Sequence, residues 1–318
     1  MTREAYLSGI AYALGDRSES VEQAVEHELT ASSAVVFRAG GFARHHRCSA
    51  GVTAYDLAHQ AVQRLGALTE VDAIIYAAAL PCNASLGSSK EFARTRDVKH
   101  LMRFAASRLQ ADFGMRGVPV FGLDQQACTG ALGAMRLARS LIAAEPEMRS
   151  ILCVTADRFP EGALYEQAYN LISDGAAAWR VSAAPAGLRI VACHQVTNGA
   201  LGCASDDETV GSFFSHALAA IRAVLDKARL RLEDVRWIVP QNTHAGAWKI
   251  VAGLLPFDPE RIYFPALPET GHVISADNLI NLKSLLDADA VRPGDRVLLF
   301  MAGYGLNWQC VLLERPRA

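Results

Sequence analysis

Cys128 stands where an apolar segment gives way to a helical one, a position that favours a reactive thiol. The stretch "VFGLDQQACTGALGAM" (residues 120–135) passes from strand-like residues through a polar Asp-Gln-Gln into a run of small residues. The first N–H groups of a helix are unpaired and carry a partial positive charge, so they stabilise a thiolate and can stabilise an oxyanion. Cys128 is therefore a candidate nucleophile; a small apolar core residue is the ordinary alternative.

Two histidines in the second half of the chain are candidates for proton transfer. His244 follows the strand-like "WIVPQ", and His272 follows a glycine in "ETGHVISADN". A single histidine is usually structural, but two at predicted strand ends favour a catalytic role. Asp277 could orient one of them as in a catalytic triad, although we favour a first-turn position stabilised by the helix dipole.

A glycine-bracketed turn near the C-terminus is a candidate oxyanion site. Gly303 and Gly305 flank Tyr304 between two apolar strands. Glycine permits a tight backbone beside a ligand, so the N–H of Tyr304 or Gly305 could complete an oxyanion hole. An ordinary hairpin turn explains the same residues equally well.

The composition is that of a globular protein and argues against several classes of function. The 318 residues are 51% hydrophobic and 20% charged, with a formal net charge of −2, which does not favour nucleic acid as a partner. Seven scattered cysteines without a CxxC pair indicate a reducing compartment, with neither disulfides nor a metal site. We expect a cytoplasmic protein without a signal peptide or membrane span, because no segment approaches ~20 apolar residues.

Apolar strands alternate with helices rich in small residues, which predicts an α/β protein. Continuous rather than alternating hydrophobicity is typical of strands covered on both faces. The predicted buried strands are 71–80, 118–123, 150–156, 188–193, 235–241 and 296–302. The predicted helices are 54–65, 96–113, 129–143, 212–228, 246–254 and 276–288.

Two patterns of the first half recur in the same order in the second half. A helix, an acidic turn and a strand over 54–80 match 213–242. The segment around Cys128, with the helix and strand that follow it, matches 269–302. The recurrence predicts two duplicated halves, fused at "SAAPAG" near residue 185. The division is 1–185, with the cysteine, and 186–318, with the histidines.

Cys128 and His272 occupy equivalent positions in the two predicted halves, because each stands at the start of a predicted helix. Two helix N-termini that face each other across a pseudo-twofold axis would form one site from both halves. Close packing of these helices would also explain why the residues around Cys128 are small.

The motifs "DQQACTGALGAM", "SDGAAAW", "VPQNTHAGAWKI", "GHVISADN" and "AGYGLNW" occur in an order that resembles ketoacyl-ACP synthase III and its relatives in the thiolase superfamily. The resemblance covers almost the whole chain. It implies a five-layered αβαβα fold, a homodimer and a nucleophilic Cys128 that accepts an acyl group from a thioester of CoA or an acyl carrier protein. The N–H groups of Cys128 and Tyr304 would hold the oxyanion, and no permanently bound cofactor is implied.

The chain departs from this family at the residues that would assist the cysteine. Gln241 stands where the family has a histidine, His244 where the same motif ends in asparagine, and His272 where a second asparagine is usual. Gln241 or Asn242 could donate a hydrogen bond, but an amide does not shuttle protons near neutral pH. We therefore expect an acyltransferase of specialised metabolism, with His272 as general base and His244 as a second base or polariser.

Other interpretations and binding residues remain open at this stage. Decarboxylative condensation to a 3-ketoacyl product is the first alternative, and a non-catalytic partner subunit of a heterodimer is the second. Lys249 and the basic turn Arg44–Arg47 are candidates for contacting a CoA or phosphopantetheine phosphate, and a solvated surface role explains each equally well. The small-molecule acceptor is not identified by the sequence.

Overall fold

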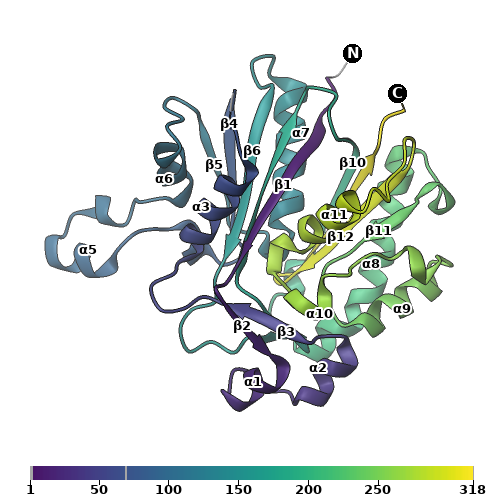
Figure 1. Cartoon of the computed structure of the whole chain (residues 1–318), viewed down its shortest axis with the longest axis horizontal. Helices are drawn as coiled ribbons and strands as arrows, with labels where there is room; N and C mark the ends of the chain where they lie inside the picture. The colour runs from purple at the N-terminus through teal and green to yellow at the C-terminus, as the bar shows by residue number, and fades with distance from the viewer. Residues whose placement is uncertain (1–2, 69, 318) are drawn as a thin grey trace.

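One mixed sheet of nine strands organises the part of the chain that the computed structural model describes, residues 3–68 and 70–317 (Figure 1). The strand order is β11-β12-β13-β10-β1-β9-β6-β4-β5. These strands are β1 (Tyr6–Leu14), β4 (Ala73–Ala77), β5 (Val120–Leu123), β6 (Ser150–Asp157), β9 (Gly175–Ser182), β10 (Leu188–Thr197), β11 (Trp237–Val239), β12 (Arg296–Gly303) and β13 (Asn307–Glu314). Two small hairpins add β2 (Arg17–Ser20) with β3 (Arg44–Arg47), and β7 (Glu166–Gln167) with β8 (Asn170–Leu171).

The helices cover both faces of this sheet. They are α1 (Val21–Glu26), α2 (Ala34–Gly40), α3 (Ala54–Leu65), α4 (Pro81–Ala84), α5 (Ser89–Thr95), α6 (Ala105–Asp112), α7 (Gly130–Ala144), α8 (Asp206–Ala228), α9 (Ala245–Leu254), α10 (Leu267–Thr270) and α11 (Asp277–Asp287). Within the described residues, none of them combines the length and apolarity needed to cross a bilayer.

Strand β1 joins two parts of the sheet that separate beyond it. It pairs with β9 from Tyr6 to Leu14, but with β10 only at Tyr6 and Leu7. The part from β1 to β5 belongs to the first half of the chain, and the part from β10 to β13 belongs to the second. The separation leaves room for helices between the two parts.

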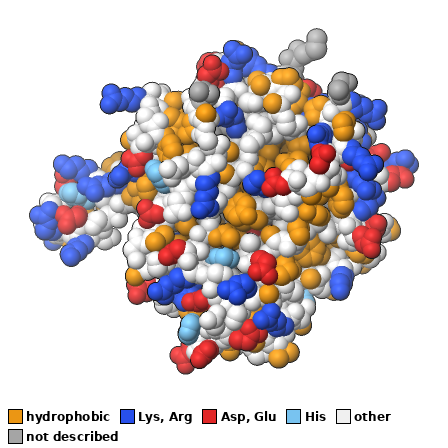
Figure 2. Space-filling model, viewed as in Figure 1, with side chains coloured by type: hydrophobic (Ala, Val, Ile, Leu, Met, Phe, Trp, Pro, Cys, Tyr) orange, Lys and Arg blue, Asp and Glu red, His pale blue; other side chains and the backbone are white. Residues whose placement is uncertain are grey.

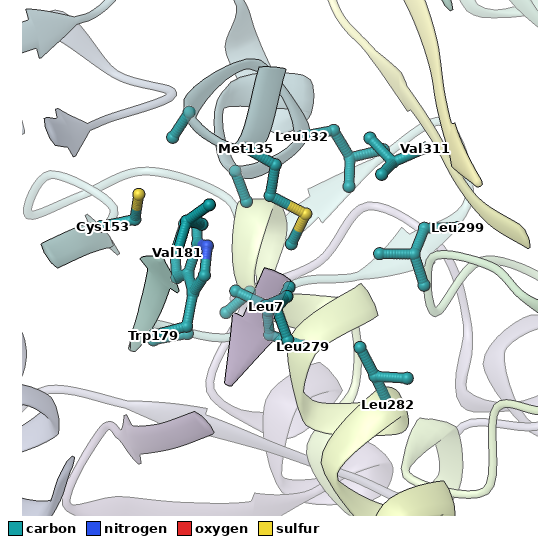
Figure 3. Packing of buried hydrophobic residues seen from close by; sticks show 14 of the residues in the cluster. Leu7, Leu132, Met135, Cys153, Trp179, Val181, Leu279, Leu282, Leu299 and Val311 are labelled. Atoms are coloured by element: carbon teal, nitrogen blue, oxygen red, sulfur yellow. The ribbon is translucent and has the colours of Figure 1, made fainter. Parts of the chain in front are cut away.

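Five layers follow from the way the helices pack on these two parts of the sheet. Buried side chains of α3 and α6 cover the outer face of the first part, and those of α8 and α9 cover the outer face of the second. Helices α7 and α11 lie between the two parts, where Leu132 and Met135 of α7 share one core with Leu279 and Leu282 of α11 (Figure 3). The predicted αβαβα fold is confirmed. The assignment of two domains at residue 185 stays a prediction.

Most of the predicted elements agree with the structure to within a few residues at each end. The predicted helix 96–113 is instead a short turn at Val98–His100 followed by α6, which begins at Ala105. Strands β1 and β9 were not among the predicted strands, because "YLSGIAYAL" and "GAAAWRVS" are poor in β-branched residues. Helix α8 begins at Asp206 rather than 212.

Candidate active site

Cys128 lies in a single 3-10 turn, Ala127–Thr129, between β5 and α7. Its side chain is buried, and Ala127 before it has φ = +44°, a conformation that costs a non-glycine residue free energy and is enriched at functional sites. A Cβ on Gly133 would collide with the Gln126 side chain, and one on Gly130 would lie 3.1 Å from Ala77 Cβ. There is therefore little room for a larger side chain at Gly130 or Gly133 unless its neighbours move.

The glycine-bracketed turn lies directly against the cysteine. A Cβ on Gly303 would lie 2.9 Å from the Cys128 backbone nitrogen. Gly303 and Tyr304 line the same cavity as Cys128, whereas Gly305, with φ = +91°, does not. The two backbone segments expected to supply oxyanion donors are thus neighbours, and the oxyanion hole itself stays a prediction.

His272 forms a buried pair with Asp277. Its Nδ1 lies 2.5 Å from Asp277 Oδ2, and the two side chains are 4% and 0% exposed. The Asp277 carboxylate also accepts the N–H of Val273 at 2.6 Å and that of Asn242 at 2.7 Å. Asp277 is the first residue of α11, as expected. Its carboxylate also orients His272, the triad-like role that the sequence favoured less than the first-turn position.

The environment of His272 favours its protonated form. Burial by itself lowers the pKa of His272, but the Asp277 carboxylate and a hydrogen bond with the Cys128 side chain raise the pKa to about 10. Both contacts favour the imidazolium because each places negative charge or an acceptor beside it. The His272 imidazole therefore lies between the Asp277 carboxylate, to which it is hydrogen-bonded, and the Cys128 side chain.

His244 lines the cavity, and a hydrogen bond at Nδ1 holds its imidazole ring. It is the N-cap of α9, and its Nδ1 accepts the Gly246 N–H at 3.1 Å. Because the Nδ1 lone pair is engaged, the neutral ring carries its proton on Nε2. His244 lines the same cavity as Cys128 and His272. Of the two roles expected for it, this geometry favours the polariser over the base.

The neighbouring amides have different roles. Gln241 lines the cavity, and its Oε1 accepts the Ala302 N–H at 2.5 Å, which leaves the Nε2 donors for a ligand. Asn242 is fully buried and donates to Thr270 Oγ1 and the Gly271 carbonyl. The expectation that Asn242 lines the site is wrong, since its amide is consumed in supporting the turn before His272.

The structure does not bring the predicted basic turn to the cavity. Arg47 donates two hydrogen bonds to the Glu19 carboxylate, at 2.9 and 2.7 Å, and Arg44 bonds to Ser18. The Arg47 charge is therefore compensated within the protein. Lys249 is exposed on α9 and is next in sequence to Ile250, which lines the cavity, but none of these three basic residues lines the cavity itself.

The cavity has a volume of about 430 Å³ and is mainly apolar and aromatic. Among the described residues, no Lys, Arg, Asp or Glu lines it. Its aromatic wall comprises Tyr169, Phe213, Phe214, Tyr304 and Trp308. The described residues contain no cluster of three or more groups that could hold a metal ion. Basic and acidic side chains are interspersed on the face in Figure 2.

Sequence reasoning missed the β7–β8 hairpin and the first turns of α8. Tyr169 and Asn170 of the hairpin line the cavity, but "QAYN" has no glycine or proline to indicate a turn. The start of α8 carried a readable signal. Ser205 and Glu208 form a capping box, the S-x-x-E pattern typical of a helix N-terminus.

Known proteins match this chain in sequence and in fold. Residues 124–199 match the model of 3-oxoacyl-[acyl-carrier-protein (ACP)] synthase III, and residues 225–315 match the model of its C-terminal part. Beta-ketoacyl-[acyl-carrier-protein] synthase III of Chlamydia muridarum is 24% identical over 276 residues, which is 78% of this chain and 78% of that protein.

Solved structures extend the likeness over the whole chain. 3-Oxoacyl-[acyl-carrier-protein] synthase III of Aquifex aeolicus superposes with a TM-score of 0.81 at 21% identity, covering 98% of this chain and 99% of that one. The acyltransferase ChlB3 superposes with a TM-score of 0.78 at 18% identity, covering 99% and 98%. At these identities the structural likeness shows the fold.

Proposed function

The chain belongs to the 3-oxoacyl-[acyl-carrier-protein] synthase III group of the thiolase superfamily, and from this premise we propose that it is an acyltransferase that works through acyl-Cys128. It takes an acyl group from a thioester of CoA or an acyl carrier protein and delivers it to an alcohol, amine or thiol. The observation that carries the proposal is the position of His272, which lines the same cavity as Cys128 and has its Nδ1 2.5 Å from the buried Asp277 carboxylate. A histidine backed by a buried carboxylate can accept and return a proton.

The first half-reaction forms the acyl-enzyme. In the resting pair the proton is on His272, and the Cys128 thiolate attacks the thioester carbonyl carbon. The resulting oxyanion is stabilised by the Cys128 N–H and an N–H of the turn at Tyr304. When the intermediate collapses, the bond to the carrier sulfur breaks. The His272 proton passes to the leaving thiolate, so the imidazole becomes neutral.

The second half-reaction uses that neutral imidazole. His272, oriented by Asp277, removes the proton of the acceptor nucleophile as it attacks the acyl-Cys128 carbonyl. Collapse of this intermediate releases the Cys128 thiolate and leaves the proton on His272, which restores the resting pair. The Nε2–H of His244 binds and orients the acceptor.

The cavity suits an uncharged, extended substrate arm. Because no charged side chain lines it among the described residues, the phosphates of CoA or phosphopantetheine remain at its opening, near Lys249. We further propose a cytoplasmic homodimer in specialised metabolism. The seven free cysteines support a reducing compartment, and β5 has an unpaired edge at the end of the sheet that can pair with a second copy.

Decarboxylative condensation is the second candidate function, and one observation favours it. Gln241 Nε2 and His244 Nε2–H are two donors on the wall of the same cavity. Two donors on the carbonyl of a malonyl thioester would stabilise the enolate that forms when carbon dioxide leaves. That Cys128 and His272 line one cavity argues against a non-catalytic subunit.

Intact-protein mass spectrometry with a panel of acyl-CoA thioesters tests the proposal. Wild-type protein should gain one acyl mass, and Cys128→Ala should gain none. Adducts confined to other cysteines would overturn the assignment. Labelled carbon dioxide released from a malonyl thioester would select condensation over transfer to an acceptor.

A further inference from the structure

The β7–β8 hairpin connects the first half of the chain to both site histidines. Its two-residue turn has φ = +45° at Ala168 and +64° at Tyr169, the left-handed pair that tight hairpin turns require. Neither turn residue is Gly, Asn or Asp, so the turn is strained. Strain of this kind persists where surrounding contacts enforce it.

Asn170 supplies those contacts. Its Nδ2 donates to the carbonyls of Gln167 at 3.1 Å and Ala168 at 2.9 Å, so the side chain closes its own turn. Its Oδ1 accepts the backbone N–H of His244 at 2.8 Å. Asn170 is 9% exposed, and these three bonds use both donors and the acceptor oxygen of its amide.

The bond to His244 determines where that imidazole can lie. His244 is the N-cap residue of α9, so its backbone N–H lies outside the helix and would otherwise need water. Asn170 anchors the backbone on one side, and the Gly246 N–H anchors Nδ1 on the other. The remaining polar group, Nε2–H, is then left for a ligand in the cavity.

His272 is held to the same segment by different atoms. Its N–H donates to the Leu171 carbonyl at 2.8 Å, and its carbonyl accepts the Ser173 N–H at 2.9 Å. These are backbone bonds and do not involve the Asn170 amide. Loss of that amide should therefore displace His244 while leaving the Cys128–His272 pair in place.

We propose that Asn170 is a positioning residue that holds His244 as an N–H donor for the acceptor in the second half-reaction. This rests on the proposed function. Asn170→Ala should acylate Cys128 within about twofold of the wild-type rate. Transfer should slow by roughly ten- to a hundredfold, the usual cost of misplacing a group by about 1 Å. Asn170→Asp keeps an oxygen for the His244 N–H and should recover most of the transfer rate.

The two half-reactions are measured separately by intact-protein mass spectrometry. The enzyme is first acylated with the acyl-CoA that labels wild type most strongly. Hydroxylamine then serves as the amine-class acceptor, and the rate of its uncatalysed reaction with a free thioester is subtracted. Glu166→Gln is the matched control, since it loosens the opposite end of the hairpin, where Glu166 accepts the Ala31 and Ser32 N–H groups. It should lower the thermal midpoint without slowing transfer relative to acylation.

A double-mutant cycle separates positioning from general destabilisation. If Asn170 acts through the imidazole, Asn170→Ala should slow transfer no further in a His244→Ala background. Losses that multiply, or equal slowing of acylation and transfer in Asn170→Ala, would overturn the inference.

Nitrogen-15 NMR of the His244 ring provides a readout that needs no acylation. Wild type should show a protonated Nε2, and Asn170→Ala should show a mixture of tautomers; an unchanged spectrum would refute the positioning role. If wild type never acylates, the proposed function fails, and this spectrum still decides the role of Asn170.

Discussion

His272 Nδ1 and Asp277 Oδ2 lie 2.5 Å apart at the buried start of α11. The two residues are five positions apart in the chain, so the turn Val273–Ala276 brings them together, and the Val273 N–H donates to the other carboxylate oxygen. This local geometry charges the imidazole beside Cys128, and most of the chemistry proposed for the protein depends on it.

Asp277→Asn should lower the pKa of His272, because it removes the negative charge that offsets burial. The less charged imidazole stabilises the Cys128 thiolate less. Alkylation of Cys128 by iodoacetamide at pH 7 should then slow by roughly tenfold, because less positive charge lies beside the sulfur. The assay needs a Cys82→Ser/Cys203→Ser background, since those two cysteines are exposed. Equal alkylation rates would remove Asp277 from the mechanism.

The same pair should make stability depend on pH in a defined direction. The pKa of His272 is about 10 in the folded protein, above ~6.5 for an unfolded histidine. Its stabilising contribution is therefore complete below pH ~6.5 and is lost as the pH rises through the folded value. In urea unfolding, the stability advantage of wild type over Asp277→Asn should shrink between pH 7 and 9.5. An advantage that grows would contradict the raised pKa.

Gly303→Ala should impair acylation of Cys128, because the added Cβ would lie 2.9 Å from the Cys128 nitrogen. Displacing an oxyanion donor costs about a hundredfold or more in rate. Gly253→Ala on α9 is the matched control, since a Cβ there meets nothing within 4 Å. Acylation at the control rate would show that the turn has no part in the oxyanion site.

Lys249→Glu should raise the KM for acyl-CoA by roughly three- to tenfold at low salt and leave kcat little changed. The difference in KM between variant and wild type should disappear above about 0.5 M salt, which screens the charge. Lys249 is exposed beside the cavity-lining Ile250. Arg44→Ser, on β3 away from the cavity, should leave the KM unchanged. If Arg44→Ser raised the KM more than Lys249→Glu does, the phosphates would bind near Arg44 and not near Lys249.

Much of the architecture was readable from the sequence because it depends on local patterns. The apolar run before Cys128 and the small residues after it predicted a strand, a nucleophile position and a packed helix. The helix predicted over 54–65 is α3, with the same bounds. Strand β9 was not predicted, because alanine has little intrinsic preference for a strand. The neighbouring strands of the sheet determine its conformation.

The candidate site was only partly readable, for a physical reason. Residue types indicated that Cys128, His244 and His272 could do chemistry, since thiol and imidazole groups are reactive wherever they are placed. The tertiary structure decided their roles. The Asn242 amide donates to the Gly271 carbonyl, and Arg47 pairs with Glu19. Asn170 accepts the backbone N–H of His244, 74 positions away. Such pairings depend on which long-range contacts bury each polar group, and no local pattern encodes them.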